Sequence, residues 1–393
     1  MGNWKMCTIA DIGTVVGGAT PSTKKEENYD GGTIAWITPK DLAVFSGRFI
    51  SCGERNITEI GLKSCSTQIM PKHTILFSSR APIGYIAIAA NEVCTNQGFK
   101  SVIPNENTDY MFLYYLLKYN KENIESLGSG TTFKEVSAST MREIRISVPE
   151  SLDEQKAIAS VLSILDDKIE KNMEINDNLQ QQIELLYENF ITSIDETPMK
   201  MSEVIDVRDG THDSPKSLES GYPLVTSKHL LPFGVDVISS NKISESDYNK
   251  VNERSKVDTN DILLSMIGTV GLVSLIIEEE INFAIKNVGL FKTSKCPQYT
   301  YYLFCYLKSK ETAQHIERCL AGSTQKYISL TELRKMPIII PSAVDINKFN
   351  DLVTPLFSLI IENVKANKAL ITIRDSLLPK FMSGEMDVAD LDL

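Results

Sequence analysis

Hydroxyl-bearing residues and a lysine gather in two short loops of this chain that could bind phosphate. The first loop reads "GSGTTFKEVS" at residues 128–137, and the second reads "LAGSTQKYIS" at residues 320–329. Backbone N–H groups, hydroxyls and a lysine ammonium are the groups that contact nucleic-acid phosphates. The same composition also suits an ordinary turn that leads into a strand. The candidate contacts of these loops are Thr131, Thr132, Lys134, Thr324, Lys326 and Tyr327.

Two other loops are rich in glycine, proline and hydrogen-bonding side chains, but their sequences differ from each other. They read "GGATPSTKKEENYDGG" at residues 17–32 and "RDGTHDSPKSLESG" at residues 208–221. If two similar domains read different base sequences, we expect the variation to lie in such loops. In and near these loops we predict DNA contacts at Thr23, Lys24, Lys25, Tyr29, Lys40, Arg80, His212, Lys216, Lys228 and His229.

Motifs for catalysis or cofactor binding are missing from the sequence. It has no G-x-G-x-x-G, no G-x-x-x-x-G-K-[ST], no H-E-x-x-H and no methyltransferase N/D-P-P-aromatic motif. The segment "PESLDEQK" at residues 149–156 superficially mimics a nuclease pattern, but acidic residues at a helix start are explained by capping and the helix dipole. His212 and His229 lack a repeated Cys or Ser partner, which argues against a nucleophilic triad. We expect a binding protein with no catalytic residue and no metal site.

The candidate loops belong to a sequence that repeats with a period of about 190 residues, which is right for a duplicated domain. "ILFSSRAPIG" at residues 75–84 returns as "ILLSMIGTVG" at 262–271, and "NQG" at 96–98 returns as "NVG" at 287–289. "IRISVPES" at 144–151 returns as "MPIIIPSA" at 336–343, and a long polar helix is expected after each. The repeat predicts domains at 1–150 and 200–341, and helical spacers at 151–199 and 342–393.

Both globular copies are predicted to be mixed α/β domains with a compact, curved sheet. The segment at residues 33–42 is typical of a strand and a turn, and residues 74–89 alternate like a hairpin. Residues 109–127 have helical spacing, and residues 298–320 hold the matching helix of the second copy.

Each long helix is expected to begin at a capping serine and to carry one apolar seam. Ser151 and Glu154 form a predicted capping box, and Ser342 with Asp345 repeats it. The 4-3 spacing of the seam is that of a coiled coil with buried asparagines, which fix register at a cost in stability. The first seam is Ile158, Leu162, Leu165, Ile169, Asn172, Asn176, Leu179, Ile183, Leu186 and Phe190. The second is Val353, Phe357, Ile360, Val364, Asn367, Ile371, Leu378 and Phe381.

Because each helix leaves one domain and returns to the other, we expect the two helices to pair antiparallel. Each has roughly 40 residues and a length of about 60 Å, so the pair would act as a ruler between the domains. A connector without a metric role is the alternative interpretation. The predicted fold class is therefore α+β, with two similar mixed α/β domains separated by a long antiparallel two-helix coiled coil and related by a pseudo-twofold.

Net charge separates the helices from the domains. The chain of 393 residues carries a formal charge of −11, but residues 1–150 hold 15 Lys and Arg against 15 Asp and Glu, and residues 200–341 hold 17 against 17. The acidic excess lies at residues 151–199 and 342–393, with net charges of −8 and −3. Each neutral domain could still present a basic face to DNA, whereas the acidic helices suit a protein partner.

The cysteines and the hydropathy pattern predict the cellular compartment of the chain. The seven cysteines are scattered and form no C-x-x-C pair, which argues against a zinc site and fits a reduced, cytoplasmic chain. No signal peptide, membrane span or myristoylation pattern is recognised, so we expect cytoplasmic localisation and no membrane partner.

At this point the motifs resemble a known family, the specificity subunits of type I restriction–modification enzymes. "TPS…YDGGTIAWITPKDL" at residues 20–42 resembles the opening of one type of target-recognition domain, and "RDGTHDSP" at 208–215 with "GYPLVTSKHL" resembles another. "ISVPESLDEQKAIASVLSILDDKIE" at 146–170 resembles the central helical region of the family, and "LLPKFMSGEM" at 377–386 its C-terminal ending. The second copy departs from the pattern at residues 343–349, where the EQ pair is missing, so the two helix starts need not be built alike.

The resemblance implies a DNA-recognition subunit that is not itself an enzyme. Each domain would read one half of a split site in double-stranded DNA, and the helix pair would set the gap. Two methyltransferase subunits and restriction/translocase subunits would dock on it. The chain itself would bind no cofactor, because S-adenosylmethionine, ATP and Mg²⁺ would belong to those partners.

Three alternatives stay open at the level of sequence. The chain could be the specificity module of a methylation-only or other defence system, in which the binding role would be the same. It could be a structural coiled-coil adaptor, which a gel shift with a methyltransferase partner would distinguish. It could be a stand-alone methyltransferase, which the missing cofactor motifs disfavour.

Overall fold

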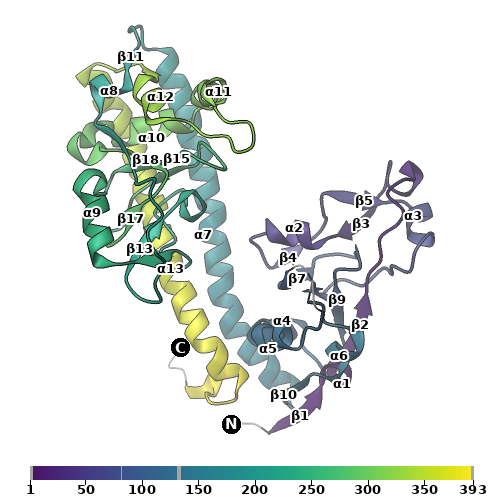
Figure 1. Cartoon of the computed structure of the whole chain (residues 1–393). Helices are drawn as coiled ribbons and strands as arrows, with labels where there is room; N and C mark the ends of the chain where they lie inside the picture. Colours follow the sequence, from purple (N-terminus) through teal and green to yellow (C-terminus); the bar gives the residue numbers. More distant parts are fainter. Residues whose placement is uncertain (1–2, 81, 131–133, 391–393) are drawn as a thin grey trace. The chain divides into compact units, whose positions relative to one another are not determined.

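In the computed structural model, residues 3–80, 82–130 and 134–390 are described, and the chain divides into two units (Figure 1). The first unit comprises residues 1–171 and 367–393, and the second comprises residues 172–366. The long helices α7 (Leu152–Thr192) and α13 (Ala343–Met382) each contribute one part to each unit. The predicted domain boundaries themselves stay predictions.

The first unit is built on a five-stranded sheet of order β2-β9-β6-β7-β4 and a three-stranded sheet of order β5-β3-β8, with β1 paired to β10. Its strands are β1 (Trp4–Thr8), β2 (Gly13–Gly17), β3 (Ile34–Ile37), β4 (Phe49–Ile50), β5 (Arg55–Ile57), β6 (Ile75–Ser79), β7 (Ile83–Ala89), β8 (Cys94–Thr95), β9 (Lys100–Pro104) and β10 (Arg145–Pro149). Its helices before α7 are α1 (Ile9–Ile12), η1 (Glu26–Asn28), α2 (Pro39–Ala43), α3 (Glu59–Lys63), α4 (Tyr110–Tyr119), α5 (Lys121–Ser126) and α6 (Ala138–Glu143).

The second unit has a four-stranded sheet of order β12-β18-β15-β16 and a three-stranded sheet of order β14-β13-β17, with β11 paired to β19. Its strands are β11 (Met199–Lys200), β12 (Val207–Asp209), β13 (Tyr222–Val225), β14 (Asn241–Ile243), β15 (Ile262–Ser265), β16 (Val273–Leu275), β17 (Ala284–Ile285), β18 (Val288–Phe291) and β19 (Pro337–Ile338). Its helices before α13 are α8 (Met201–Val204), η2 (Ser227–His229), α9 (Glu245–Ser255), η3 (Thr293–Lys295), η4 (Pro297–Tyr299), α10 (Thr300–Lys308), α11 (Lys310–Cys319) and α12 (Leu330–Lys335). The last helical turn of the chain is η5 (Val388–Asp390) in the first unit.

Both units follow one topology, which confirms the predicted duplication and the α+β class. The order β2-β9-β6-β7 corresponds to β12-β18-β15-β16, and β5-β3-β8 corresponds to β14-β13-β17. In both small sheets the central strand pairs antiparallel with one neighbour and parallel with the other. The predicted hairpin at residues 74–89 is β6 and β7, which are antiparallel with an irregularity between Phe77 and Ser79.

The helix predicted over residues 109–127 is two helices, α4 and α5, which meet at Asn120. Its counterpart is likewise divided into α10 and α11, because the Ser309 side chain accepts a hydrogen bond from the Thr312 backbone N–H at 3.2 Å and starts a new helix there. Within the described residues, no helix is both long enough and apolar enough to cross a membrane.

The capping serines of the long helices lie where the sequence predicts them. The Glu154 backbone N–H donates to Ser151 Oγ at 3.4 Å, and the Asp345 N–H donates to Ser342 Oγ at 3.2 Å. The two helix starts differ at the EQ pair. Buried Gln155 accepts from the N–H of Asp109 at 3.0 Å and so fixes the start of α4 against α7.

The predicted seam residues are buried or half-buried, with one exception. In the second unit Asn363 Nδ2 donates to Asn176 Oδ1 at 2.8 Å, and in the first unit Asn367 Nδ2 donates to the Ile169 carbonyl at 3.1 Å. In each unit α7 therefore packs against α13. The later residue of α7 contacts the earlier residue of α13, as an antiparallel pair requires. The prediction for Ile371 is wrong: its side chain is 37% exposed. Arg374 faces α7 in its place, because it pairs with the buried carboxylate of Asp166.

The "LDDKIE" segment fastens the first domain to α7. Glu170 accepts two hydrogen bonds at 2.9 Å from the guanidinium of Arg48, which also pairs with Asp167. Arg48 is buried, and these carboxylates compensate the cost of burying its charge. The residues that make this family motif recognisable in sequence are thus contacts between a helix and a domain.

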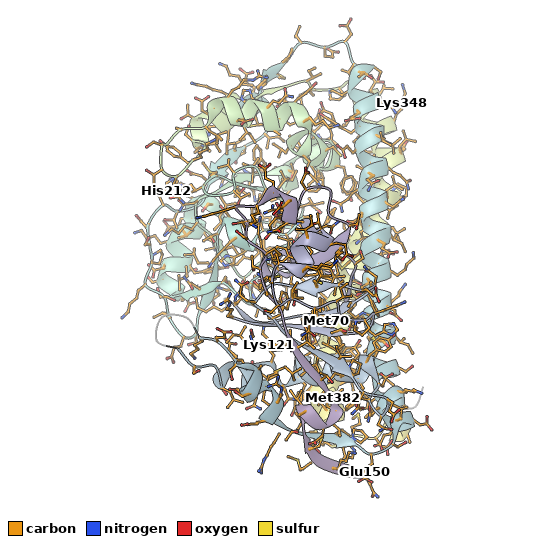
Figure 2. All side chains as sticks on the ribbon, turned by 90° about the vertical axis from the view of Figure 1, so that its right-hand side faces the viewer. Met70, Lys121, Glu150, His212, Lys348 and Met382 are labelled. Atoms are coloured by element: carbon orange, nitrogen blue, oxygen red, sulfur yellow. The ribbon has the colours of Figure 1, made fainter. Side chains whose placement is uncertain are left out.

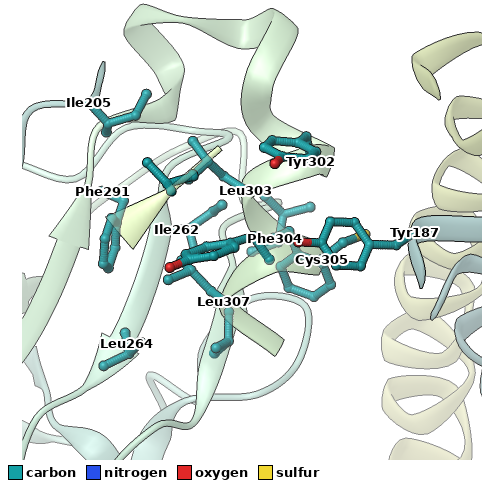
Figure 3. Packing of buried hydrophobic residues seen from close by; sticks show 14 of the residues in the cluster. Tyr187, Ile205, Ile262, Leu264, Phe291, Tyr302, Leu303, Phe304, Cys305 and Leu307 are labelled. Atoms are coloured by element: carbon teal, nitrogen blue, oxygen red, sulfur yellow. The ribbon is translucent and has the colours of Figure 1, made fainter. Parts of the chain in front are cut away.

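The core of the second unit joins its sheet to both long helices. Figure 3 shows Ile262, Leu264 and Phe291 from the sheet and Tyr187 from α7, together with residues of α10: Tyr302, Leu303, Phe304, Cys305 and Leu307. Tyr187 lies 5.8 Å from the Tyr302 ring between centroids. Because the domain and the helix share one core, the helix is a structural part of the domain and not a separate linker.

Candidate nucleic-acid interface

A turn of the form Thr-x-Lys-Asp/His-Leu follows the central strand of each small sheet. After β3, the Thr38 N–H and hydroxyl both donate to Asp41 Oδ2, at 2.7 and 2.6 Å. After β13, the Thr226 N–H donates to His229 Nδ1 at 2.9 Å, so His229 fills the place of Asp41. The lysine between them, Lys40 or Lys228, is exposed in both units. The turn therefore presents one cation at the same position of each domain.

His229, which we predict from sequence as a DNA contact, is buried within this turn. Its side chain is 2% exposed, and burial lowers its pKa. A neutral ring with Nδ1 as the acceptor is what the cap on Thr226 requires. His229 therefore stabilises the turn, and Lys228 is the exposed side chain next to it.

Tyr29 is the second predicted contact that the fold buries. Its hydroxyl donates to the Pro21 carbonyl at 2.6 Å, and the Arg55 guanidinium lies 4.1 Å from its ring centre. The neighbouring candidates Thr23, Lys24 and Lys25 are exposed just before η1. Tyr29 thus anchors the loop that displays them.

The β6–β7 and β15–β16 turns are held by the same serine. Ser78 Oγ donates to the Pro82 carbonyl and accepts from the Tyr85 N–H, both at 2.8 Å. Ser265 makes the same two bonds, to Thr269 at 2.5 Å and from Leu272 at 2.8 Å. Arg80 extends from the first of these turns, half-buried, with Nη1 3.9 Å from Glu135 Oε2.

The two hydroxyl-rich loops lie beside these turns. Backbone bridges join Arg80 to Glu135 in the first unit and Ile267 to Tyr327 in the second. Lys134, Thr324, Lys326 and Tyr327 are exposed, whereas Thr131 and Thr132 lie outside the described residues. In each unit the structure therefore brings together two loops that lie about 55 to 60 residues apart in the sequence, as a composite recognition surface requires.

The variable loop of the second unit carries His212 and Lys216, both exposed (Figure 2 labels His212). His212 Nε2 lies 3.0 Å from Asp209 Oδ2, and its Nδ1 lies 2.7 Å from Asn287 Oδ1. The other oxygen of Asp209 accepts from Arg254 Nη2 at 2.9 Å. Lys216 lies further along the same loop.

Asn287 and Thr269 are candidate site residues that the sequence reasoning missed. With Thr226, Ser227, Lys228, Ile267, Gly268 and Leu272 they line a hollow of about 280 Å³ in the second unit. The "NQG/NVG" repeat was the available signal, since it placed an asparagine at the same point of both copies. A hollow where three loops meet offers polar groups from separate parts of the chain to one ligand.

The charges of the candidate loops differ from those that hold the fold. Among residues 3–80, 82–130 and 134–390, no carboxylate pairs with Lys134, Lys216, Lys228 or Lys326, so these cations are available to phosphates. Asp206 is different: hydrogen bonds from Arg208 and Lys295 lower the pKa of its carboxyl to about 2. Within the described residues, no cluster of His, Cys, Asp and Glu could hold a metal ion.

Comparison with known proteins gives a consistent match over the chain. The family model for the type I restriction modification DNA specificity domain matches twice, at residues 1–184 and 196–369. A relative from Methanocaldococcus jannaschii, the type I restriction enzyme MjaIX specificity subunit, is 37% identical over 421 aligned residues, which cover 99% of this chain and 95% of the relative.

A more distant relative and a solved structure agree. The EcoR124I/EcoR124II specificity subunit of Escherichia coli is 30% identical over 192 residues, or 46% of this chain and 44% of the relative. The crystal structure of a type I restriction–modification S subunit from M. genitalium aligns with a TM-score of 0.57 and 18% identity, over 97% of this chain and 96% of that one. The structural alignment supports the predicted fold.

Proposed function

The chain belongs to the type I restriction modification DNA specificity family, and we propose that it is the DNA sequence-recognition subunit of a type I restriction–modification complex. The observation that carries this proposal is the duplication itself. Two domains share one strand order and the same serine- and threonine-held turns, yet they differ in the loops that those turns display. Such a pair suits the reading of two unlike sequences by one kind of surface.

Each domain reads one half of a split site in double-stranded DNA. The lysines of equivalent turns, Lys40 and Lys228, and of equivalent loops, Lys134 and Lys326, contact phosphates and fix the register on the duplex. The divergent loops, which contain Lys24 and Lys216, supply contacts that depend on sequence. Lys40 currently pairs with Glu54 at 2.7 Å, an exposed ion pair that DNA phosphate can replace at little cost.

The helix pair sets the gap between the half-sites and receives the partners. Two methyltransferase subunits dock on the chain, and restriction/translocase subunits join them. Support for protein partners comes from the charge distribution, since residues 151–199 carry a net charge of −8 and would repel a polyanion.

The chain is a non-catalytic subunit and binds no cofactor of its own. S-adenosylmethionine, ATP and Mg²⁺ belong to the partner subunits, because the sequence has no motif that would hold them. The complex works in the cytoplasm, where all seven cysteines, which are free thiols in the structure, stay reduced.

A domain exchange tests the proposal. The chain is co-expressed with its methyltransferase partner in a host without adenine methylation, and the methylated motif is read from the host genome. Residues 200–341 are then replaced by the equivalent domain of a relative. We expect a bipartite motif from the original complex, and a change in one half of it from the chimera.

The outcomes separate the proposal from its alternatives. If the exchange changes both halves of the motif, independent reading by two domains is refuted. If the complex produces no sequence-specific methylation and the chain shifts no DNA in a gel with its partner, a coiled-coil adaptor is the better interpretation. Adding the restriction subunit distinguishes a restriction system, which cleaves unmodified DNA, from a methylation-only system.

A further inference from the structure

Asn287 lies at the wall of the hollow in the second unit, between two turns that display candidate DNA contacts. One wall is the Thr226–Lys228 turn, and another is the Ile267–Thr269 turn held by Ser265. Asn287 is half-buried at the point where β17 leads into β18. Its amide therefore stands beside exposed Lys228, within the surface proposed above to meet DNA.

Asn287 differs from Asn96, the residue that the sequence repeat aligns with it. Asn287 has φ of 55°, in the left-handed region that asparagine tolerates better than most residues. In the first unit Asn96 uses its own Oδ1 to accept from the Gly98 N–H at 2.8 Å, which closes a local turn. The amide of Asn287 instead bonds to a residue 75 positions away, His212. The first unit has a similar long-range contact, between Thr20 Oγ1 and Gln97 Oε1.

His212 is itself held on its other side. Its Nε2 lies 3.0 Å from the buried carboxylate of Asp209, whose second oxygen accepts from Arg254 at 2.9 Å. The ring is thus fixed between a carboxylate and an amide, although the His212 side chain is 60% exposed. Since His212 contacts only one end of the Asn287 amide, the other end is left for a ligand, together with the remaining hydrogen-bonding position of the first end.

We propose that Asn287 reads a base edge in the half-site of the second domain, and that His212, braced by Asp209 and Arg254, is its positioning residue. This inference rests on the proposed function and names where the second domain obtains its specificity. An asparagine amide presents a donor and an acceptor side by side, which complements N7 and N6–H₂ of adenine in the major groove. The second half-site therefore contains an adenine whose recognition depends on Asn287.

Methylome mapping of the complex with its methyltransferase tests the assignment. Asn287→Asp keeps the shape and the left-handed backbone but removes the N–H donors, and Asn287→Gly keeps the backbone and removes the amide. We expect each to lower the preference for adenine at one position by roughly tenfold to a hundredfold, the range of a good bidentate contact. The half-site of the first domain should not change. Asn282→Ala is the matched control, because this exposed asparagine precedes the same β17–β18 segment.

The positioning role of His212 has its own readout. His212→Ala should weaken discrimination at the same base position, and should add no further loss when combined with Asn287→Gly, because the two residues then act through one contact. An independent, additive loss would overturn the positioning role. Thermal unfolding of each variant shows whether the domain is still folded.

The result that overturns the inference differs from the one that overturns the function. If the original complex methylates a bipartite motif and both Asn287 variants, folded, methylate the same motif with the same base preference, Asn287 reads no base and the proposed function stands. If the original complex methylates no defined motif, the proposed function fails.

Discussion

Asp166 of α7 and Arg374 of α13 form an ion pair in the first unit, with 2.6 Å between Oδ1 and Nη1. The other carboxylate oxygen of Asp166 accepts from the Tyr115 hydroxyl at 2.6 Å. Burial, together with the Asp166 charge, raises the pKa of Tyr115, so the phenol keeps the proton that it donates. One buried carboxylate thus joins both long helices to α4 of the first domain.

Removing one partner of this pair should destabilise the first unit. Asp166→Ala leaves Arg374 buried without its carboxylate and Tyr115 without its acceptor, and we expect unfolding free energy to fall by roughly 3–5 kcal/mol. Urea unfolding followed by circular dichroism measures this loss. Lys348→Ala, which removes an exposed i,i+3 pair with Asp345, is the control and should change it by less than about 0.5 kcal/mol. Equal effects of the two substitutions would contradict the structural role of Asp166.

The Asn176–Asn363 hydrogen bond predicts that removing one asparagine destabilises the protein more than replacing both. Asn176→Ala leaves the Asn363 amide unpaired near the helix seam and should cost roughly 1–3 kcal/mol. The double replacement Asn176→Leu with Asn363→Leu removes both polar groups and should stay within about 1 kcal/mol of the original protein. A double-mutant cycle by urea unfolding gives the coupling between the two sites. Additive costs would show that the asparagines do not act as a pair.

The low pKa of Asp206 predicts acid sensitivity in the second unit. Because hydrogen bonds from Arg208 and Lys295 lower the folded pKa to about 2 from 3.8, the contribution of Asp206 to stability is fully present above pH 4 to 5. It is lost as pH falls through the folded pKa. The difference in melting temperature between the original protein and Asp206→Asn should therefore be constant near neutral pH and shrink between pH 4 and pH 2. A difference that does not change over this range would contradict the assignment.

The sequence predicts what depends on local pattern. The capping serines, the β6–β7 hairpin, the buried asparagines at 172, 176 and 367, and the duplication all follow from spacing and composition, and the structure confirms them. The prediction for Ile371 is wrong because the 4-3 spacing gives no sign of the ion pair between Arg374 and the buried carboxylate of Asp166 on the other helix.

The candidate site was less predictable, because its contacts join distant parts of the chain. A tyrosine or histidine in a polar loop has the composition of a surface contact, yet Tyr29 and His229 are buried by hydrogen bonds that hold their turns. The Asn287–His212 contact spans 75 residues and exists only once β12 and β18 are paired. Loop composition indicates where a site lies, whereas the fold decides which side chains reach it.

The loop lysines should affect DNA binding in a way that does not depend on sequence. Lys326→Ala in the complex with methyltransferase should weaken binding to cognate and non-cognate DNA alike, and reduce the slope of log K against log salt by about 1, because one phosphate contact is lost. Lys134→Ala should do the same through the first domain. Fluorescence anisotropy at several salt concentrations gives the slope. A change in the methylated motif with an unchanged slope would instead identify the lysine as a base contact.

The helix pair should set the distance between the half-sites. The Asn176–Asn363 contact shows that residues 172–178 and 361–367 lie in facing parts of α7 and α13. Deleting both heptads keeps the apolar seam in register and shortens the pair by about 10 Å at 1.5 Å per residue. That distance corresponds to roughly 3 base pairs of DNA.

We therefore expect the deletion variant to methylate the same two half-sites with a gap about 3 base pairs shorter, or to lose methylation if the two methyltransferase subunits then collide. The Asn176→Leu, Asn363→Leu variant has the original length and should keep the original gap, which separates the effect of length from the loss of the Asn176–Asn363 contact. Methylome mapping reads both outcomes directly. If the shortened protein methylated half-sites with the original gap at full occupancy, the helices would be connectors without a metric role. The length of the helix pair would then not determine the gap.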